Sequence, residues 1–97
     1  MTEIYMKNLT STIHQFEGDI SSDLDNIRKA AHKVIPSSRH MGFNQLAEQL
    51  KQLELNIING IEYEIVKNQL KVILVDANEV LDQLKTFLES IKDKINQ

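Results

Sequence analysis

Apolar residues recur along the chain at steps of three and four, and no stretch alternates between apolar and polar residues over the length of a strand. Such spacing places apolar side chains along one side of a helix. The sequence therefore predicts an all-α fold, with helices over about 3–16, from near 22 to 41, over 43–58, and from 62 almost to the end.

Helix-ending signals separate these segments. The letters EGD at 17–19 end the first helix, Gly42 ends or turns the second, and the pair Asn59 and Gly60 ends the third. Ser22 and Asp25 have the spacing of a capping box at the start of the second helix. Its inward stripe is predicted to hold Leu24, Ile27, Ala31, Val34, Ser38 and Met41.

The apolar stripes of the other helices complete a predicted core. They consist of Tyr5, Leu9, Ile13 and Phe16, then Leu46, Leu50, Leu53 and Ile57, then Leu70, Ile73, Leu74, Ala77, Leu81, Leu84, Leu88, Ile91 and Ile95. Four such helices with short connections predict one domain, 1–97, folded as an antiparallel up-down four-helix bundle with a long C-terminal helix. The last helix also keeps a seven-residue apolar period from 74 to 95, as a coiled coil would, but its wide stripe favours a bundle core.

Composition narrows the function. The chain has 97 residues and no cysteine, and the lack of cysteine excludes disulfides and thiol chemistry. Its net charge of -3 argues against a general nucleic-acid binder. It lacks an apolar run of the ~18 residues that a membrane span needs, and its first residues do not resemble a signal peptide. We expect a cytoplasmic domain without membrane insertion.

His32 is predicted to face outward, because it falls about 110° from the centre of the apolar stripe of the second helix. Arg28, Pro36 and Arg39 lie on the same outward strip. Between Asn26 and Ala47 the chain has four basic residues, Arg28, Lys29, Lys33 and Arg39, and no acidic one. These residues predict a local positive patch around an exposed histidine.

Pro36 stands inside the predicted helix. It has no N–H to donate to the carbonyl of His32, at a local cost of up to about 3 kcal/mol. Either the helix ends at Ile35 and restarts, or it continues with a bend. Because the stripe from Leu24 to Met41 is unbroken, we predict the continuous, bent helix.

The segment AHKVIPSSRHMGFNQLAEQLKQLE resembles the signature of histidine-containing phosphotransfer (HPt) domains of bacterial phosphorelays, A-H-x-L-K-G-S-S-x-x-L-G followed by a helix with L and L-E. The resemblance covers about 24–54. The matching positions are Ala31, His32, Val34, Ser37, Ser38, Met41, Gly42, Leu46, Leu53 and Glu54. Two positions depart from the signature, since its lysine is Ile35 here and its glycine is Pro36.

The resemblance implies that Nε2 of His32 accepts a phosphoryl group from the aspartyl phosphate of a response-regulator receiver domain and passes it to another receiver. Contacts with receivers would be transient, the domain would be a monomer without kinase activity, and it would hold no cofactor, since Mg²⁺ comes with the receiver. We expect no metal site at the histidines and no catalytic base beside His32. The residues expected to support phosphate or partner binding are Arg28, Lys29, Lys33, Arg39, Ile35, Pro36, Ser37 and Gly42, and Arg28 and Arg39 are expected to replace the charge of the missing lysine.

Two other functions stay open at this point. One is a helical adaptor, or a degenerate HPt domain, in which His32 is inert. The other is the dimeric phosphoacceptor domain of a sensor kinase, in which two chains form the bundle and the proline follows the histidine at five residues rather than four. We favour the relay domain, as a piece of a hybrid sensor kinase.

Overall fold

The structure is a computed structural model that describes the backbone of residues 2–18 and 24–95 and the side chains of 3–18 and 24–91. It consists of helices α1 (Thr2–Glu17), α2 (Leu24–His40), α3 (Asn44–Ile58) and α4 (Tyr63–Ile95). These described ranges contain no strand. The prediction of an all-helical fold is therefore confirmed, while the predicted capping box depends on Ser22, outside the described residues.

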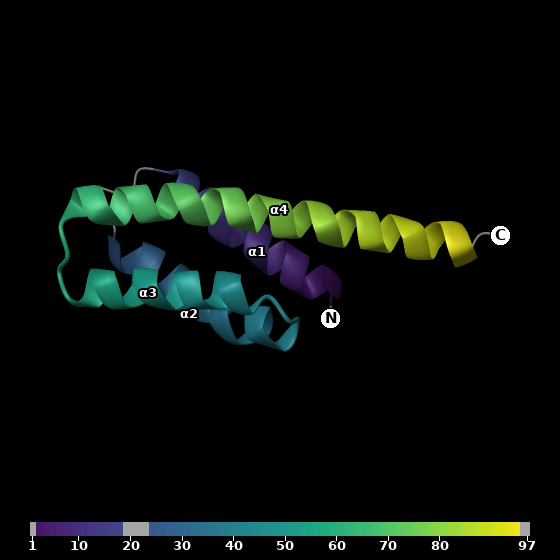
Figure 1. Ribbon diagram of the computed structural model, residues 1–97, viewed down its shortest axis with the longest axis horizontal. Coiled ribbons are helices and arrows are strands. Elements are labelled where there is room, and N and C mark those ends of the chain that lie inside the picture. Colours follow the sequence, from purple (N-terminus) through teal and green to yellow (C-terminus); the bar gives the residue numbers. More distant parts are fainter. Residues whose placement is uncertain (1, 19–23, 96–97) are drawn as a thin grey trace.

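The helices pack in a closed order of neighbours. α1 contacts α2, α2 contacts α3, α3 contacts α4, and α4 contacts α1. Figure 1 shows α4 as the longest helix, with its C-terminal part running past the ends of the other three. This order is consistent with a helical bundle, and it places α2 and α3, which carry the matched segment, side by side.

Most residues of the predicted stripes form the core, but Leu24, Met41, Ile57 and Leu74 are only half-buried against it, and the core also includes residues outside the stripes, such as Ala47. On α2 and α3, the side chains of Ala31, Val34, Ala47, Leu50 and Leu53 are all 0% exposed. Small residues at 31 and 47 let these two helices approach closely, and the larger residues fill the space between them. The close packing of α2 on α3 fixes which of their outward residues can meet.

The predicted stripe of α4 is only partly buried. It is covered as far as Leu84, at 6% exposure, but Leu88 is half-buried and Ile91 is 37% exposed. The reason is that this part of α4 extends beyond the other helices, so no neighbour covers it (Figure 1). The prediction that Leu88 and Ile91 belong to the core is therefore wrong, and the side chain of Ile95 lies outside the described ones.

Two glycines form the turns that the sequence indicates. Gly42 has a φ of +89° and Gly60 a φ of +69°, a left-handed conformation in which a β-carbon would be strained. After α2, the amide of Phe43 donates to the carbonyl of Ser38 over 2.9 Å and satisfies one of the last helical carbonyls. The predicted ends of the second and third helices are confirmed.

A buried polar pair joins α1 to α2. The hydroxyl of Tyr5 lies 2.8 Å from Oγ of Ser38, and both residues are buried. The Tyr5 ring also stacks on Phe43, with ring centroids 6.0 Å apart. Burial raises the pKa of the Tyr5 phenol, and the hydrogen bond with Ser38 lowers it by less.

This raised pKa predicts that the domain loses stability in strong base. Above the phenol's ordinary pKa of about 10, the unfolded chain gives up the proton that the folded chain keeps, so the free energy of unfolding falls as pH rises. In Tyr5→Phe this fall should be smaller. Urea unfolding between pH about 9 and 11 measures it, with Tyr63→Phe, at an exposed position, as the control. The same fall in Tyr5→Phe and in the unsubstituted domain would contradict the prediction.

Candidate functional site

His32 lies near the middle of α2 and points outward. Its neighbour Ala31 is 0% exposed, whereas the His32 side chain is 71% exposed. The apolar stripe thus fixes the inner side of α2 and leaves the imidazole in solvent. This confirms the predicted orientation of His32.

Glu54 of α3 holds one nitrogen of the imidazole. Its Oε2 lies 2.7 Å from Nδ1 of His32, and its side chain is only 15% exposed. An ionised carboxylate can only accept a hydrogen bond, so Nδ1 carries the proton in this pair. For a neutral ring, Nε2 then keeps its lone pair, and no described group bonds to it.

This carboxylate beside His32 was not anticipated from the sequence, and whether Glu54 acts as a catalytic base stays untested. Glu54 is separated from it by 22 residues in the sequence, and only the packing of α2 on α3 brings the two together. The sequence did single out Glu54, because this residue follows Leu53 at the end of the segment that resembles HPt domains. Its role could not be assigned without the register between the helices.

The basic residues before His32 are engaged by a carboxylate of their own helix. Arg28 donates to Oδ1 of Asp25 from Nε over 3.1 Å and from Nη2 over 2.9 Å, and Lys29 lies 3.2 Å from Oδ2. The bonds from Arg28, and then from Lys29, lower the pKa of the Asp25 carboxyl. Because Asp25 lies a turn before Arg28, these bonds direct the guanidinium away from His32.

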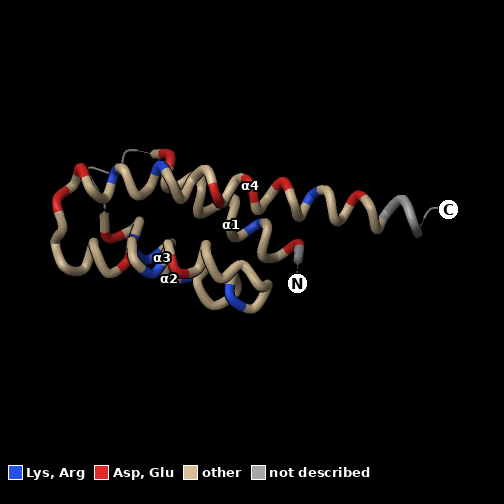
Figure 2. Tube along the Cα trace, in the orientation of Figure 1, with Lys and Arg blue, Asp and Glu red and all other residues tan. Residues whose placement is uncertain are grey.

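Arg39, on the C-terminal side of His32, is also bonded to a carboxylate, in this case one of α3. Its Nη2 lies 2.9 Å from Oε1 of Glu48 on α3. It follows His32 by seven residues, which is about 10 Å along the helix axis. Figure 2 shows acidic residues of α3 close to the basic residues of α2. The predicted positive patch is thus partly neutralised, because Arg28 and Lys29 share Asp25 and Arg39 is bonded to Glu48. This corrects the picture of a histidine surrounded by free guanidinium groups.

The other residues expected to support the site are spread over several environments. Ile35 is 9% exposed and belongs to the core, so it adds nothing to the surface around His32. Ser37 donates its hydroxyl to the carbonyl of Val34 over 3.2 Å. Gly42 lies in the turn after α2, and Lys33 is exposed, without an ion pair among the described side chains.

α2 continues through Pro36, which is exposed. The alternative, a helix that ends at Ile35, is therefore wrong, and the bend at the proline stays a prediction. Pro36 follows His32 by one turn and has no long side chain to cover it. The approach to the imidazole from this side is left open.

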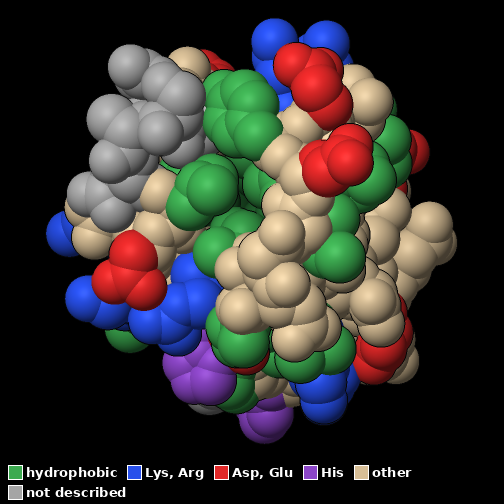
Figure 3. Space-filling model, turned by 90° about the vertical axis from the view of Figure 1, so that its left-hand side faces the viewer, with side chains coloured by type: hydrophobic (Ala, Val, Ile, Leu, Met, Phe, Trp, Pro, Cys, Tyr) green, Lys and Arg blue, Asp and Glu red, His purple; other side chains and the backbone are tan. Residues whose placement is uncertain are grey.

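Apolar side chains are exposed at the end of the molecule where α3 is followed by α4. They are Ile58, Ile61, Tyr63 and Ile65, which are 57%, 39%, 37% and 50% exposed. Figure 3 views this end, with apolar side chains near its centre, histidine side chains toward the bottom of the view, and Lys and Arg side chains at several places around the rim. Ile58 lies one turn after Glu54 on α3, so this apolar surface adjoins the His32 site.

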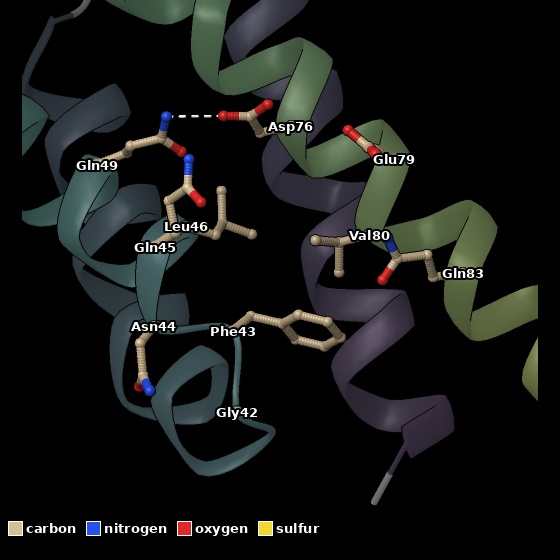
Figure 4. A pocket seen from close by; sticks show the side chains of 10 residues that line it. All are labelled: Gly42, Phe43, Asn44, Gln45, Leu46, Gln49, Asp76, Glu79, Val80 and Gln83. Atoms are coloured by element: carbon tan, nitrogen blue, oxygen red, sulfur yellow. Dashed lines mark hydrogen bonds between the residues drawn. The ribbon is translucent and has the colours of Figure 1, made fainter.

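A separate polar pocket of about 340 Å³ lies between α3 and α4 (Figure 4). Gln49 donates from Nε2 to Oδ2 of Asp76 over 2.7 Å there, while its buried Oε1 has no hydrogen-bond partner among the described residues. The lining includes the carboxylates of Asp76 and Glu79 but not His32. Within the described side chains, no three His, Cys, Asp or Glu residues are grouped so as to hold a metal ion.

None of the described helices is both long and apolar enough to cross a membrane.

Comparison of the chain with protein-family models, with curated proteins and with solved structures gives no match. The site therefore has to be interpreted from its own chemistry. That chemistry is a solvent-exposed imidazole with one nitrogen bonded to a carboxylate and the other free.

Proposed function

We propose that the chain is a phosphotransfer domain of a two-component phosphorelay, with His32 as the phosphoacceptor. The observation that carries this proposal is the pair of His32 and Glu54, in which Nδ1 is engaged over 2.7 Å and Nε2 is free on a 71% exposed side chain. The resemblance of residues 24–54 to HPt domains supports it. The proposal includes an antiparallel, up-down order of the four helices, consistent with their neighbour contacts and short connections.

The proposed reaction needs only a nucleophile and a partner. The lone pair of Nε2 attacks the phosphorus of the receiver's aspartyl phosphate, an N–P bond forms, and the P–O bond to the aspartate breaks. Nδ1 keeps its proton, and Glu54 stabilises the positive charge that develops on the ring. Attack by the aspartate of a second receiver reverses these steps and frees His32.

The partner is proposed to be a receiver domain that brings its own Mg²⁺. No set of carboxylates suited to that ion occurs among the described side chains, and the proposed step needs none from this chain. The exposed apolar surface around Ile58 lies beside the acceptor and is suited to a small, transient contact. We propose that the domain is cytoplasmic and monomeric. A single chain supplies four neighbouring helices, whereas the phosphoacceptor domain of a sensor kinase needs two chains to form its bundle.

Mass spectrometry of the domain after incubation with phosphoramidate, and separately with phosphorylated receivers, tests the proposal. Phosphoramidate is a small donor that releases ammonia as the N–P bond to the protein forms. We expect a gain of one phosphoryl group that is lost in acid and kept in base. An unchanged mass with both donors would contradict the proposal and leave a helical adaptor in which His32 is inert.

Glu54→Gln should slow phosphoryl uptake without preventing it. The amide oxygen can still accept from Nδ1, but the charge that stabilises the phosphorylated ring is lost. A charged pair at an exposed site contributes up to about 1 kcal/mol, so we expect a rate reduced about threefold to fivefold. Uptake from phosphoramidate over time measures the rate.

Glu48→Gln is the matched control, since it removes an acidic group from the same side of α3 that is bonded to Arg39 instead. It should leave the rate close to that of the unsubstituted domain. Equal rates for Glu54→Gln and Glu48→Gln would show that the bond to Nδ1 does not assist transfer.

A further inference from the structure

Phosphorylation of His32 would add negative charge beside a carboxylate, while three of the four basic residues of α2 are already bonded to other carboxylates. A phosphoryl group on Nε2 adds about two negative charges close to the carboxylate of Glu54. Arg28 and Lys29 are bonded to Asp25, and Arg39 is bonded to Glu48. Stabilising the phosphorylated state therefore calls for a further basic group within reach.

Two bonds between α2 and α3 fix the register of the facing helices. His32 is bonded to Glu54, and Arg39 is bonded to Glu48. Lys51 lies three residues from each of these glutamates, and its direction around α3 falls between theirs. It therefore shares their side of α3 and lies opposite Ile35 and Pro36, about one turn from His32.

We propose that the ammonium group of Lys51 binds the oxygens of the phosphoryl group on His32. Lys51 is exposed and makes no ion pair with any described side chain, so its ammonium group is available. From α3 it supplies the charge that the resemblance leads one to expect at position 35, where the chain has a buried Ile35. Pro36, which lies between them on α2, has only a short ring and no long side chain to intervene. This inference rests on the proposed function of His32.

Lys33 is the other basic residue near His32 without an ion pair in the described part of the chain. It follows His32 directly, so its side chain leaves α2 about 100° away. Unlike His32 and Arg39, it has no ion pair with a described α3 side chain that would fix its direction. Lys33 is therefore a matched control, with the same charge and an exposed side chain but a different direction.

The experiment compares Lys51→Gln with Lys33→Gln and with Lys51→Arg, using phosphoramidate as donor. We expect uptake by Lys51→Gln to be about threefold to tenfold slower and its phosphohistidine to hydrolyse faster. Lys33→Gln should match the unsubstituted domain, and Lys51→Arg should restore most of the rate. Salt should slow the unsubstituted domain more than Lys51→Gln, because it screens the interaction that this variant lacks.

The outcomes separate this inference from the proposed function. No uptake by the unsubstituted domain would overturn both. Normal uptake by that domain, with Lys51→Gln equal to it or no slower than Lys33→Gln, would overturn the role of Lys51 and leave His32 as the acceptor. A slow Lys51→Gln that arginine does not rescue would also overturn it, since a charge interaction tolerates that exchange.

Discussion

His32→Gln should abolish phosphoryl uptake from both phosphoramidate and phosphorylated receivers. Glutamine keeps a polar side chain of similar length and can accept from solvent, but its amide has no nucleophilic nitrogen. His32 is 71% exposed, so the exchange should leave the fold intact. Mass spectrometry checks the loss, and circular dichroism checks that the helices remain.

The chain offers close controls for this variant. His40 is an exposed histidine of the same helix, and His14 is an exposed histidine of α1. No hydrogen bond or ion pair to a described side chain involves either ring. His40→Gln and His14→Gln should take up a phosphoryl group like the unsubstituted domain. If His32→Gln retained uptake and either control lost it, the assignment of the acceptor would be wrong.

Leu53→Ala should be among the most destabilising single substitutions in the domain. Leu53 is 0% exposed, belongs to the hydrophobic core, and directly precedes Glu54 on α3. Removing a buried leucine leaves a cavity and typically costs about 2–5 kcal/mol, a large part of the stability of a small domain. Urea unfolding followed by circular dichroism gives the change in free energy.

Leu55→Ala is the matched control, two residues away on the same helix at 38% exposure. It should cost less than about 1 kcal/mol, because a substitution at the surface leaves no cavity. Similar losses for the two variants would contradict the burial of Leu53 in the core.

The sequence was sufficient to predict the four helices and most of the core, because both depend on local spacing. The turns at Gly42 and Gly60 and the outward direction of His32 follow from the same spacing. The exposure of Ile91 could not be predicted, because Ile91 continues the same three- and four-residue apolar pattern that contains the buried Leu84. What differs is whether a neighbouring helix reaches that far along α4, and this depends on the tertiary arrangement.

Only the α2 part of the site could be predicted, because the contribution of α3 also depends on the tertiary arrangement. Charge counted along α2 indicated a positive patch, but the carboxylates that neutralise part of it, Glu48 and Glu54, belong to α3. The contact of Glu54 with His32 depends on how α3 is rotated and shifted against α2. Spacing does place Ile35 on the core side of the outward strip, since it follows Ala31 by one turn, and the structure confirms that it is buried.

Nitrogen-15 NMR of the imidazole rings after phosphoryl uptake tests the central claim most directly, since it identifies which ring and which nitrogen carry the phosphorus. The account predicts phosphorus on Nε2 of His32, with the proton retained on Nδ1 opposite Glu54. Phosphorus on Nδ1 of His32, on His14 or His40, or on no ring at all would contradict it.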